Sequence, residues 1–221
     1  MLHAGGLLLK RLPQMEFPAL ADWLQGGRLS QMPAIAEKEA RKQTVADFMA
    51  LGEGPPFAEL IAGTIVMAPS PFRSHQRVVL EIAFLIRKHI ESGAFEGKLY
   101  LAPFDIHLGE SDVLCPDLSF FSSARCHLLS DRGAEGAPDL VIEVLSPSTA
   151  RRDRKDKREI YTHHGVRELW LVHPELETIE VFDLTTQPDQ PISVLENGTH
   201  EAISTSILPG FLGKLEDIFR A

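Results

Sequence analysis

Residues 138–145, PDLVIEVL, place Glu143 in the middle of an otherwise apolar run that is rich in β-branched residues. This composition predicts a buried strand, because β-branched side chains favour the pleated surface of a sheet. An unpaired carboxylate would be costly to bury there. A cation, an arginine partner or contact with solvent must compensate Glu143, so the run predicts a strand that carries either a functional site or a structural salt bridge.

Two runs before this segment have a similar, strand-like composition. They are KLYLAPFDIHL at residues 98–108 and DVLCPDLSFF at residues 112–121, and turn residues separate them. We expect these two runs and residues 138–145 to form adjacent strands. The later segments ELWLVHP, TIEVFDL, PISVLENG and EAISTSI also have the pattern of strands, and GKLEDIFR predicts a short terminal helix.

Apolar residues recur at helical spacing in two segments between the strands. The first helix is expected to begin at a Ser74 cap and to end before Gly93. The second is expected to begin at a Ser148 or Thr149 cap and to end at His164. Alternation of strands and helices in this order is typical of an α/β domain.

The chain divides into a weakly patterned front and a well-patterned body. Residues 1–42 mix Gly, Pro and charge without sustained periodicity, so we expect an N-terminal extension there. Beyond it, TVADFMAL predicts a short helix capped by Thr44, and FAELIAGTIVMA predicts two short strands that turn at Gly63. Residues 43–221 are expected to form one α/β domain with a mixed central β-sheet flanked by helices.

The charge and the cysteine content exclude several classes of protein. A formal net charge of -9 argues against a uniformly basic surface, so any contact with nucleic acid must depend on a local patch. Cys115 and Cys126 are too few for a disulfide framework or a four-cysteine zinc site, and they fit a reducing compartment. No stretch approaches the roughly 20 apolar residues of a membrane span. We therefore expect a cytoplasmic protein without membrane contact.

The spacing of the carboxylates indicates which of them can act together. Asp139 and Glu143 face the same side of one predicted strand, but they lie roughly 13 Å apart along it and cannot share an ion. Asp139 and Asp117 each belong to a Pro-Asp-Leu triplet, at residues 138–140 and 116–118. Asp117 lies on a neighbouring predicted strand, so it is the better partner for Glu143. Asp139 is expected to close a turn or cap the entry of its strand. A turn aspartate is also the alternative for Asp117.

The helix after residue 148 supplies cations. Six basic residues and two aspartates lie between Arg151 and Arg158. Asp153, Lys157 and Tyr161 follow one another at intervals of four residues, which places them on one face of a helix. Lys157 can therefore face the same cleft as Glu143, although a solvated, charged helix is the simpler explanation for most residues of the run.

These segments together resemble a known family. The stretch PDLVIEVLSPSTARRDRKDKREIYTHHGVRELWLVHPE, with FAELIAGTIVMAPSPFRSH and CPDLSFF before it, is similar to the Uma-type family of restriction endonucleases, within the PD-(D/E)XK nuclease superfamily. The resemblance extends over roughly residues 44–220 and implies a restriction-endonuclease-like core. In the superfamily, an aspartate and the acid of an acid-x-Lys motif bind Mg²⁺. The resemblance assigns these roles to Asp117 and Glu143, and it implies that Glu59 completes the acidic set.

The sequence departs from the superfamily pattern in one important place. Leu145 stands two residues after Glu143, where the superfamily has its lysine. The Uma-type family generally carries the lysine on the following helix, and Lys157 matches that position, with Tyr161 one turn later. His173 stands where the family usually has aspartate, which we take as peripheral. His75 also matches a family position, but a lone histidine is more often structural, so we leave it outside the catalytic set.

The implied chemistry is metal-assisted hydrolysis of a DNA phosphodiester bond. Asp117 and Glu143 are expected to hold Mg²⁺, for which Mn²⁺ should substitute, because carboxylate oxygens suit a hard ion. Lys157 would position a water molecule or stabilise developing negative charge. Glu59 and Tyr161 complete the expected catalytic set.

Two function classes stay open on the sequence alone. The retained Asp117, Glu143 and Lys157 favour an active Mg²⁺-dependent endonuclease. Leu145 and the acidic overall charge favour a weak or inactive nuclease fold that acts as a DNA-binding or protein-interaction module. We also expect a homodimer, because nucleases that cut both strands commonly pair two active sites, and because TIEVFDL and PISVLENG are expected to be edge strands.

Overall fold

The computed structural model describes residues 42–51, 58–67, 70–93, 95–146 and 150–220. The predicted extension, residues 1–42, lies outside this part of the chain except for Lys42, and so do the predicted caps Ser148 and Thr149. All described residues belong to one compact unit, which begins at residue 41.

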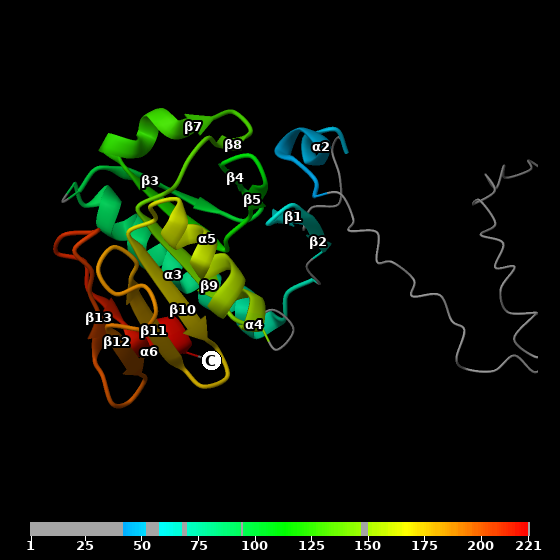
Figure 1. The fold of residues 1–221 in the computed structure, drawn as a ribbon. Helices are drawn as coiled ribbons and strands as arrows, with labels where there is room; N and C mark the ends of the chain where they lie inside the picture. Colours follow the sequence, from blue (N-terminus) through cyan, green and yellow to red (C-terminus); the bar gives the residue numbers. More distant parts are fainter. Residues whose placement is uncertain (1–41, 52–57, 68–69, 94, 147–149, 221) are drawn as a thin grey trace, which may run out of the picture. The chain divides into compact units, whose positions relative to one another are not determined.

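The centre of the fold is a six-stranded mixed sheet in the order β12-β11-β10-β9-β6-β3 (Figure 1). Strands β9 and β10 are parallel, and the other neighbouring pairs are antiparallel. The strands are β3 (Gly97–Leu101), β6 (Leu118–Ser122), β9 (Leu140–Val144), β10 (Glu168–His173), β11 (Thr178–Asp183) and β12 (Ser193–Glu196). The predicted mixed sheet is confirmed, and β9 carries Glu143 in its interior.

Helices cover both faces of this sheet, as predicted. Helix α3 (Arg73–Glu91) and the terminal helix α6 (Leu215–Phe219) pack on a core cluster that includes Ile142 and Trp170. The opposite face carries a second cluster, in which Val141 and Leu145 lie with Tyr161. Tyr161 belongs to the crossover between β9 and β10, which consists of α4 (Ala150–Arg152), a π-helical turn η3 (Asp153–Lys157) and α5 (Arg158–His163).

A second six-stranded sheet, in the order β2-β1-β5-β4-β8-β7, was not predicted. Its strands are β1 (Ala58–Ile61), β2 (Thr64–Met67), β4 (Asp105–Leu108), β5 (Asp112–Leu114), β7 (Leu129–Ser130) and β8 (Gly133–Ala134). The predicted runs 98–108 and 112–121 each divide between the two sheets, at Pro103 and at Pro116. Proline has no N–H group to donate to a β-ladder, so each long run becomes two short strands.

The smaller elements agree with the sequence except at one cap. Thr44 caps α2 (Val45–Met49) through a capping box, and the β1–β2 hairpin turns at Gly63, whose φ of 77° suits glycine. The predicted Ser74 cap is wrong, because Phe72 is the N-cap of α3 and the Ser74 hydroxyl contacts Glu175. The remaining elements are η2 (Ser123–Leu128), β13 (Ala202–Ile203) and β14 (Gly213–Lys214).

The helices of the described part of the chain are all too short or too polar to cross a bilayer.

Candidate active site

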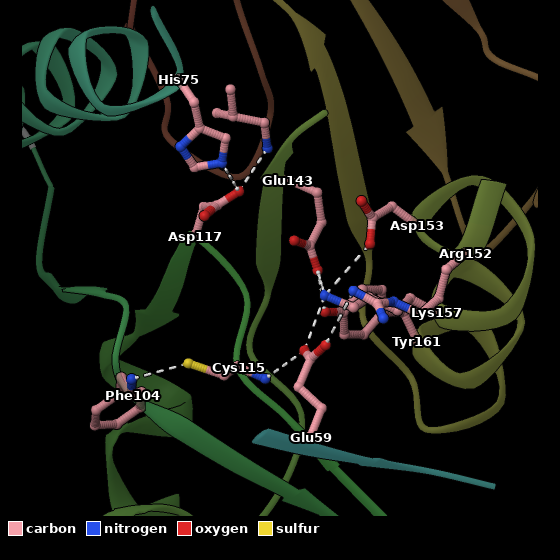
Figure 2. Close-up of polar contacts among 11 residues, drawn as sticks. Glu59, His75, Phe104, Cys115, Asp117, Glu143, Arg152, Asp153, Lys157 and Tyr161 are labelled. Carbon is pink, nitrogen blue, oxygen red and sulfur yellow. Dashed lines mark hydrogen bonds and ion pairs between the residues drawn. The ribbon is translucent and has the colours of Figure 1, made fainter. Parts of the chain in front are cut away.

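The register of β6 and β9 brings Asp117 opposite Glu143. Leu118 pairs with Ile142, so continuing the antiparallel ladder by one residue places the two acids side by side. Asp117 is held firmly, because its Oδ2 accepts the N–H of Val144 at 2.8 Å and lies 3.1 Å from Nε2 of His75 (Figure 2). The two predicted metal ligands are therefore neighbours, with Glu143 within β9 and Asp117 immediately before β6.

Lys157 reaches the centre of this site from the crossover helix. Its Nζ donates to Glu143 Oε1 at 3.1 Å, although the two residues are 14 positions apart in the sequence. The ammonium also lies 2.8 Å from Glu59 Oε1 and 3.4 Å from Asp153 Oδ1. The Lys157 side chain is only 5% exposed, so three carboxylates enclose one buried ammonium. We call Glu59, Glu143, Asp153 and Lys157 the ammonium cage.

Glu59 enters the cage from the second sheet. It lies on β1 and is buried, and its Oε1 also accepts the N–H of Cys115 at 3.0 Å. Its Oε2 is 3.9 Å from the Arg152 guanidinium. Cys115 is itself fixed by the Phe104 N–H, which donates to its Sγ at 3.3 Å. The site therefore stands where the two sheets meet (Figure 2).

Tyr161 completes the face that was predicted for the helix. Its hydroxyl donates to Glu143 Oε1 at 2.6 Å, and the side chain is fully buried. The π-helical turn keeps Asp153 and Lys157 on this face, because a fourth residue falls close to one full turn there as it does in an α-helix. The predicted grouping of Asp153, Lys157 and Tyr161 is found in the structure.

The site holds more negative than positive charge. Burial raises the pKa of the Glu143 carboxyl to about 8; Lys157 opposes this rise, and Asp153 and Asp117 add to it. Burial alone would lower the pKa of Lys157, but Glu143, Glu59 and Asp153 outweigh it and hold that pKa well above its ordinary value. The Lys157 ammonium therefore stays charged, while the Glu143 carboxyl still binds a proton near neutral pH.

This shift predicts how stability depends on pH in the absence of metal. The folded Glu143 carboxyl binds its proton more tightly than the unfolded one, whose pKa is near 4.5. Its contribution is complete below that pH and is lost as the pH rises through about 8. Relative to Glu143→Gln, wild type should lose free energy of unfolding between about pH 4.5 and pH 8, and then change little at higher pH, in urea titrations with EDTA. Parallel curves for the two proteins would contradict the shift.

The donor set fits a hard divalent cation with few protein ligands. No group of three or more His, Cys, Asp or Glu is arranged as a complete metal cage within the described ranges. Mg²⁺ commonly takes one or two carboxylates and fills its other positions with water and phosphate oxygens. Asp117 and Glu143 supply such a pair, because Lys157 and Tyr161 both bind Oε1 of Glu143 and leave Oε2 outside these contacts.

The two Pro-Asp-Leu triplets have different roles, as expected. Asp139 is buried, and its Oδ2 accepts the Ser122 N–H at 2.8 Å. Its Oδ1 lies 3.3 Å from Nε of Arg125 and 3.4 Å from Nη1 of Arg167. Arg125 also donates to the carbonyls of Ala137, Pro138 and Gly165, so Asp139 anchors the start of β9.

Replacement of Asp139 by alanine should therefore affect stability alone. We expect Asp139→Ala to lose about 3–5 kcal/mol of free energy of unfolding, because Arg125 would stay in place without its carboxylate. Chemical denaturation measures the loss. A separate titration with Mg²⁺ at low temperature, where the variant is folded, should give wild-type affinity. Lost metal affinity in a folded variant would place Asp139 in the site.

The structure shows the contacts of several side chains outside the expected catalytic set. His75, which we left outside the catalytic set, is buried and holds Asp117. Its position just after a Pro-rich turn, at the start of a helix, was the feature of the sequence that could have indicated this contact. Most of the charged run was expected to be solvated, but Arg152 lies by Glu59 and Arg158 donates to the Asp189 carbonyl at 2.8 Å. Lys155 is exposed, as expected.

Leu145 and His173 are the two positions at which the sequence departs from the superfamily and family patterns. Leu145 is buried among apolar side chains on the Glu143 face, so no lysine projects from the superfamily position. His173 is not isolated: its Nε2 contacts Arg154, which binds Glu180 through two hydrogen bonds of 2.6 and 2.7 Å. This group braces the crossover against β11.

Comparisons with known proteins identify the family and the fold of the chain. Residues 45–216 match the model of the Uma2 family, described as "Putative restriction endonuclease". Among solved structures, the fold is similar to that of a "putative nuclease" from Anabaena variabilis, with a TM-score of 0.66 and 23% sequence identity over 80% of this chain and 97% of that chain. No curated protein sequence matches. The comparisons confirm the family resemblance and the restriction-endonuclease-like fold.

Proposed function

Because the chain belongs to the Uma2 family, we propose that it is a Mg²⁺-dependent endonuclease that hydrolyses phosphodiester bonds of DNA. The contact between Lys157 Nζ and Glu143 Oε1 carries the proposal. Lys157 supplies, from the crossover helix, an amine that is missing from the strand, where Leu145 occupies the position of the superfamily's lysine. A buried lysine with three buried carboxylates is a costly way to stabilise a fold, because a wholly apolar group of similar size could fill the same space, so its chemistry is the better explanation for it.

The chain's own residues have distinct tasks in this proposal. Val144 N–H and His75 orient Asp117, and Tyr161 orients Glu143, so both carboxylates keep fixed positions. A bound Mg²⁺ would polarise the phosphate and lower the pKa of a bound water. Lys157 keeps its positive charge beside the reacting phosphate and stabilises the negative charge that develops there.

Exposed basic side chains close in sequence to site residues support DNA as the substrate despite the acidic net charge. Arg73 lies two residues before His75, and Arg151 and Lys155 lie on the crossover beside Lys157. All three are exposed. Such exposed basic side chains can bind the phosphate backbone, and their contribution should weaken as salt concentration rises.

A cleavage assay tests the proposal directly. Purified protein is incubated with supercoiled plasmid, single-stranded DNA and RNA, each with Mg²⁺, Mn²⁺ or EDTA. We expect DNA to be cut with either metal and to stay intact in EDTA. Binding of Mg²⁺ without cleavage of any substrate would favour the alternative, an inactive nuclease fold used as a binding module.

We further propose a homodimer, with one correction to the surface. The segment TIEVFDL forms β11, which is paired on both sides and is not an edge. Strand β12, from the segment PISVLENG, is one of the two edges of this sheet, and Val194 on it is 51% exposed beside Ile192 at 53%. Pairing of two β12 strands would bury these side chains. Light scattering at micromolar concentration should give twice 24.5 kDa; the monomer mass would contradict the dimer.

A further inference from the structure

A pocket next to the ammonium cage is not used by the proposed chemistry. It has a volume of about 520 Å³ and lies between the β1–β2 hairpin and the crossover helices. Ile61, Val66 and Ile160 form apolar walls, and the carboxylates of Asp156 and Glu159 lie at its rim. This volume is within the range of sites for small ligands, and apolar walls with a few polar groups are typical of such sites.

Arg152 connects this pocket with the site. It lines the pocket, and its guanidinium lies 3.9 Å from Glu59 Oε2. Its Nε is buried without a hydrogen-bond partner among the described residues, and its side chain is 19% exposed. A guanidinium with a long ion pair and an unused donor is poorly fixed, so it can turn toward an anion that enters between Glu59 and the pocket.

From this arrangement we propose that the pocket binds the base of an unpaired nucleotide adjacent to the phosphate that is cut. Arg152 binds the phosphate of that nucleotide, and the apolar walls receive the face of its base. This assignment rests on the proposed nuclease function and deepens it, because it names the form of DNA that the site accepts.

The charge of the pocket decides which part of DNA it takes. Asp112, Asp156 and Glu159 would repel a phosphate backbone running through the pocket. Carboxylates accept hydrogen bonds from exocyclic amino groups, which cytosine and adenine carry and thymine lacks. Asp112 is fixed, since its Oδ1 accepts the Ala62 N–H at 2.6 Å. The pocket therefore favours an amino-bearing base over thymine.

A base inside a duplex cannot enter such a pocket. It must be unpaired already or leave the stack, and both routes are used by proteins that act on single nucleotides. The inferred substrate is DNA with a single-stranded segment, a flap or a mismatch next to the cut. A fully paired duplex should be the poorer substrate.

Binding of mononucleotides tests the pocket without any cleavage. Saturation-transfer NMR is recorded with dCMP, dTMP and deoxycytidine on wild type, Thr64→Trp, Leu176→Trp and Arg152→Gln. Thr64 is exposed and lines the pocket, so tryptophan there should fill it without unfolding the protein. Leu176, which is 66% exposed and outside the pocket, is the matched control.

We expect dCMP to bind wild type and Leu176→Trp at least roughly fivefold more tightly than dTMP. Thr64→Trp should lose the binding. Arg152→Gln should lose the preference for dCMP over deoxycytidine. Equal binding of dCMP by Thr64→Trp and wild type would overturn the pocket assignment, as would equal affinity for dCMP and dTMP.

A cleavage experiment separates the pocket from the proposed function. Wild type and Thr64→Trp are compared on a paired duplex and on the same duplex with one unpaired cytosine. Faster cutting of the unpaired substrate that Thr64→Trp abolishes supports the inference. Cleavage that is insensitive to Thr64→Trp overturns the pocket and leaves the nuclease. Specific dCMP binding without cleavage supports the pocket and removes the nuclease function.

Discussion

Lys157→Met should reduce metal-dependent DNA cleavage by about 10²–10³-fold, because a preorganised charge in a buried site contributes that much to a transition state. Methionine has a similar length and no charge, so it removes the ammonium with little change of shape. Single-turnover cleavage under saturating Mg²⁺ measures the loss. Lys155→Met is the matched control: Lys155 is exposed two residues away and should affect only salt-dependent DNA affinity.

The stability of the Lys157 variant should fall as well. Glu59, Glu143 and Asp153 would lose the cation that they share, and breaking a buried ion pair commonly costs about 3–5 kcal/mol. Circular dichroism must confirm that the variant is folded at the assay temperature. A complementary Lys157→Ala variant leaves room in the cage for a small cation, so added methylammonium should partly restore cleavage. Full activity of Lys157→Met together with loss in Lys155→Met would refute the assignment.

Asp117→Asn should weaken Mg²⁺ binding by more than about tenfold, the lower limit for loss of a group that supports a metal site. The asparagine carbonyl can still accept the Val144 N–H, so the side-chain NH2 group would face the metal. This nitrogen is a donor and has no lone pair available for a metal ion. Isothermal titration of the metal at constant pH measures the change. Affinity for wild type should also rise with pH through about 8, because metal and proton compete for Glu143.

The second Pro-Asp-Leu triplet provides the control for this experiment. Asp139→Asn makes the same change in a similar local sequence, but Asp139 binds Arg125 and Arg167 at the other end of β9. Its Mg²⁺ affinity should equal that of wild type. Equal binding by Asp117→Asn and wild type would remove Asp117 from the metal site.

The sequence predicted the centre of the site because its geometry follows from local periodicity. Strand spacing separated Asp139 from Glu143, and four-residue intervals brought Asp153, Lys157 and Tyr161 to one face. Both relations depend only on the rise and the repeat of regular elements. They persist in the structure, even though η3 is a π-helical turn.

The second sheet and its contribution could not be predicted in the same way. Its strands are short. Two of them, β4 and β5, belong to runs that have the pattern of single strands, and only Pro103 and Pro116 indicate that each run divides in two. Pairing of Leu60 with Val113 joins segments 53 residues apart, which no local pattern encodes. Glu59 was therefore placed only by family resemblance, and the contact of His75 with Asp117 was missed.

Glu59 and Lys157 meet across 98 positions of the chain, and this separation has a consequence for when activity can arise. Contacts of such long range are late events in folding, because a large loop must close before they form. During synthesis, the hairpin with Glu59 leaves the ribosome well before the helix that carries Lys157. A nascent or incompletely folded chain has its acids without their ammonium, so the proposed DNA cleavage is withheld until the fold is complete.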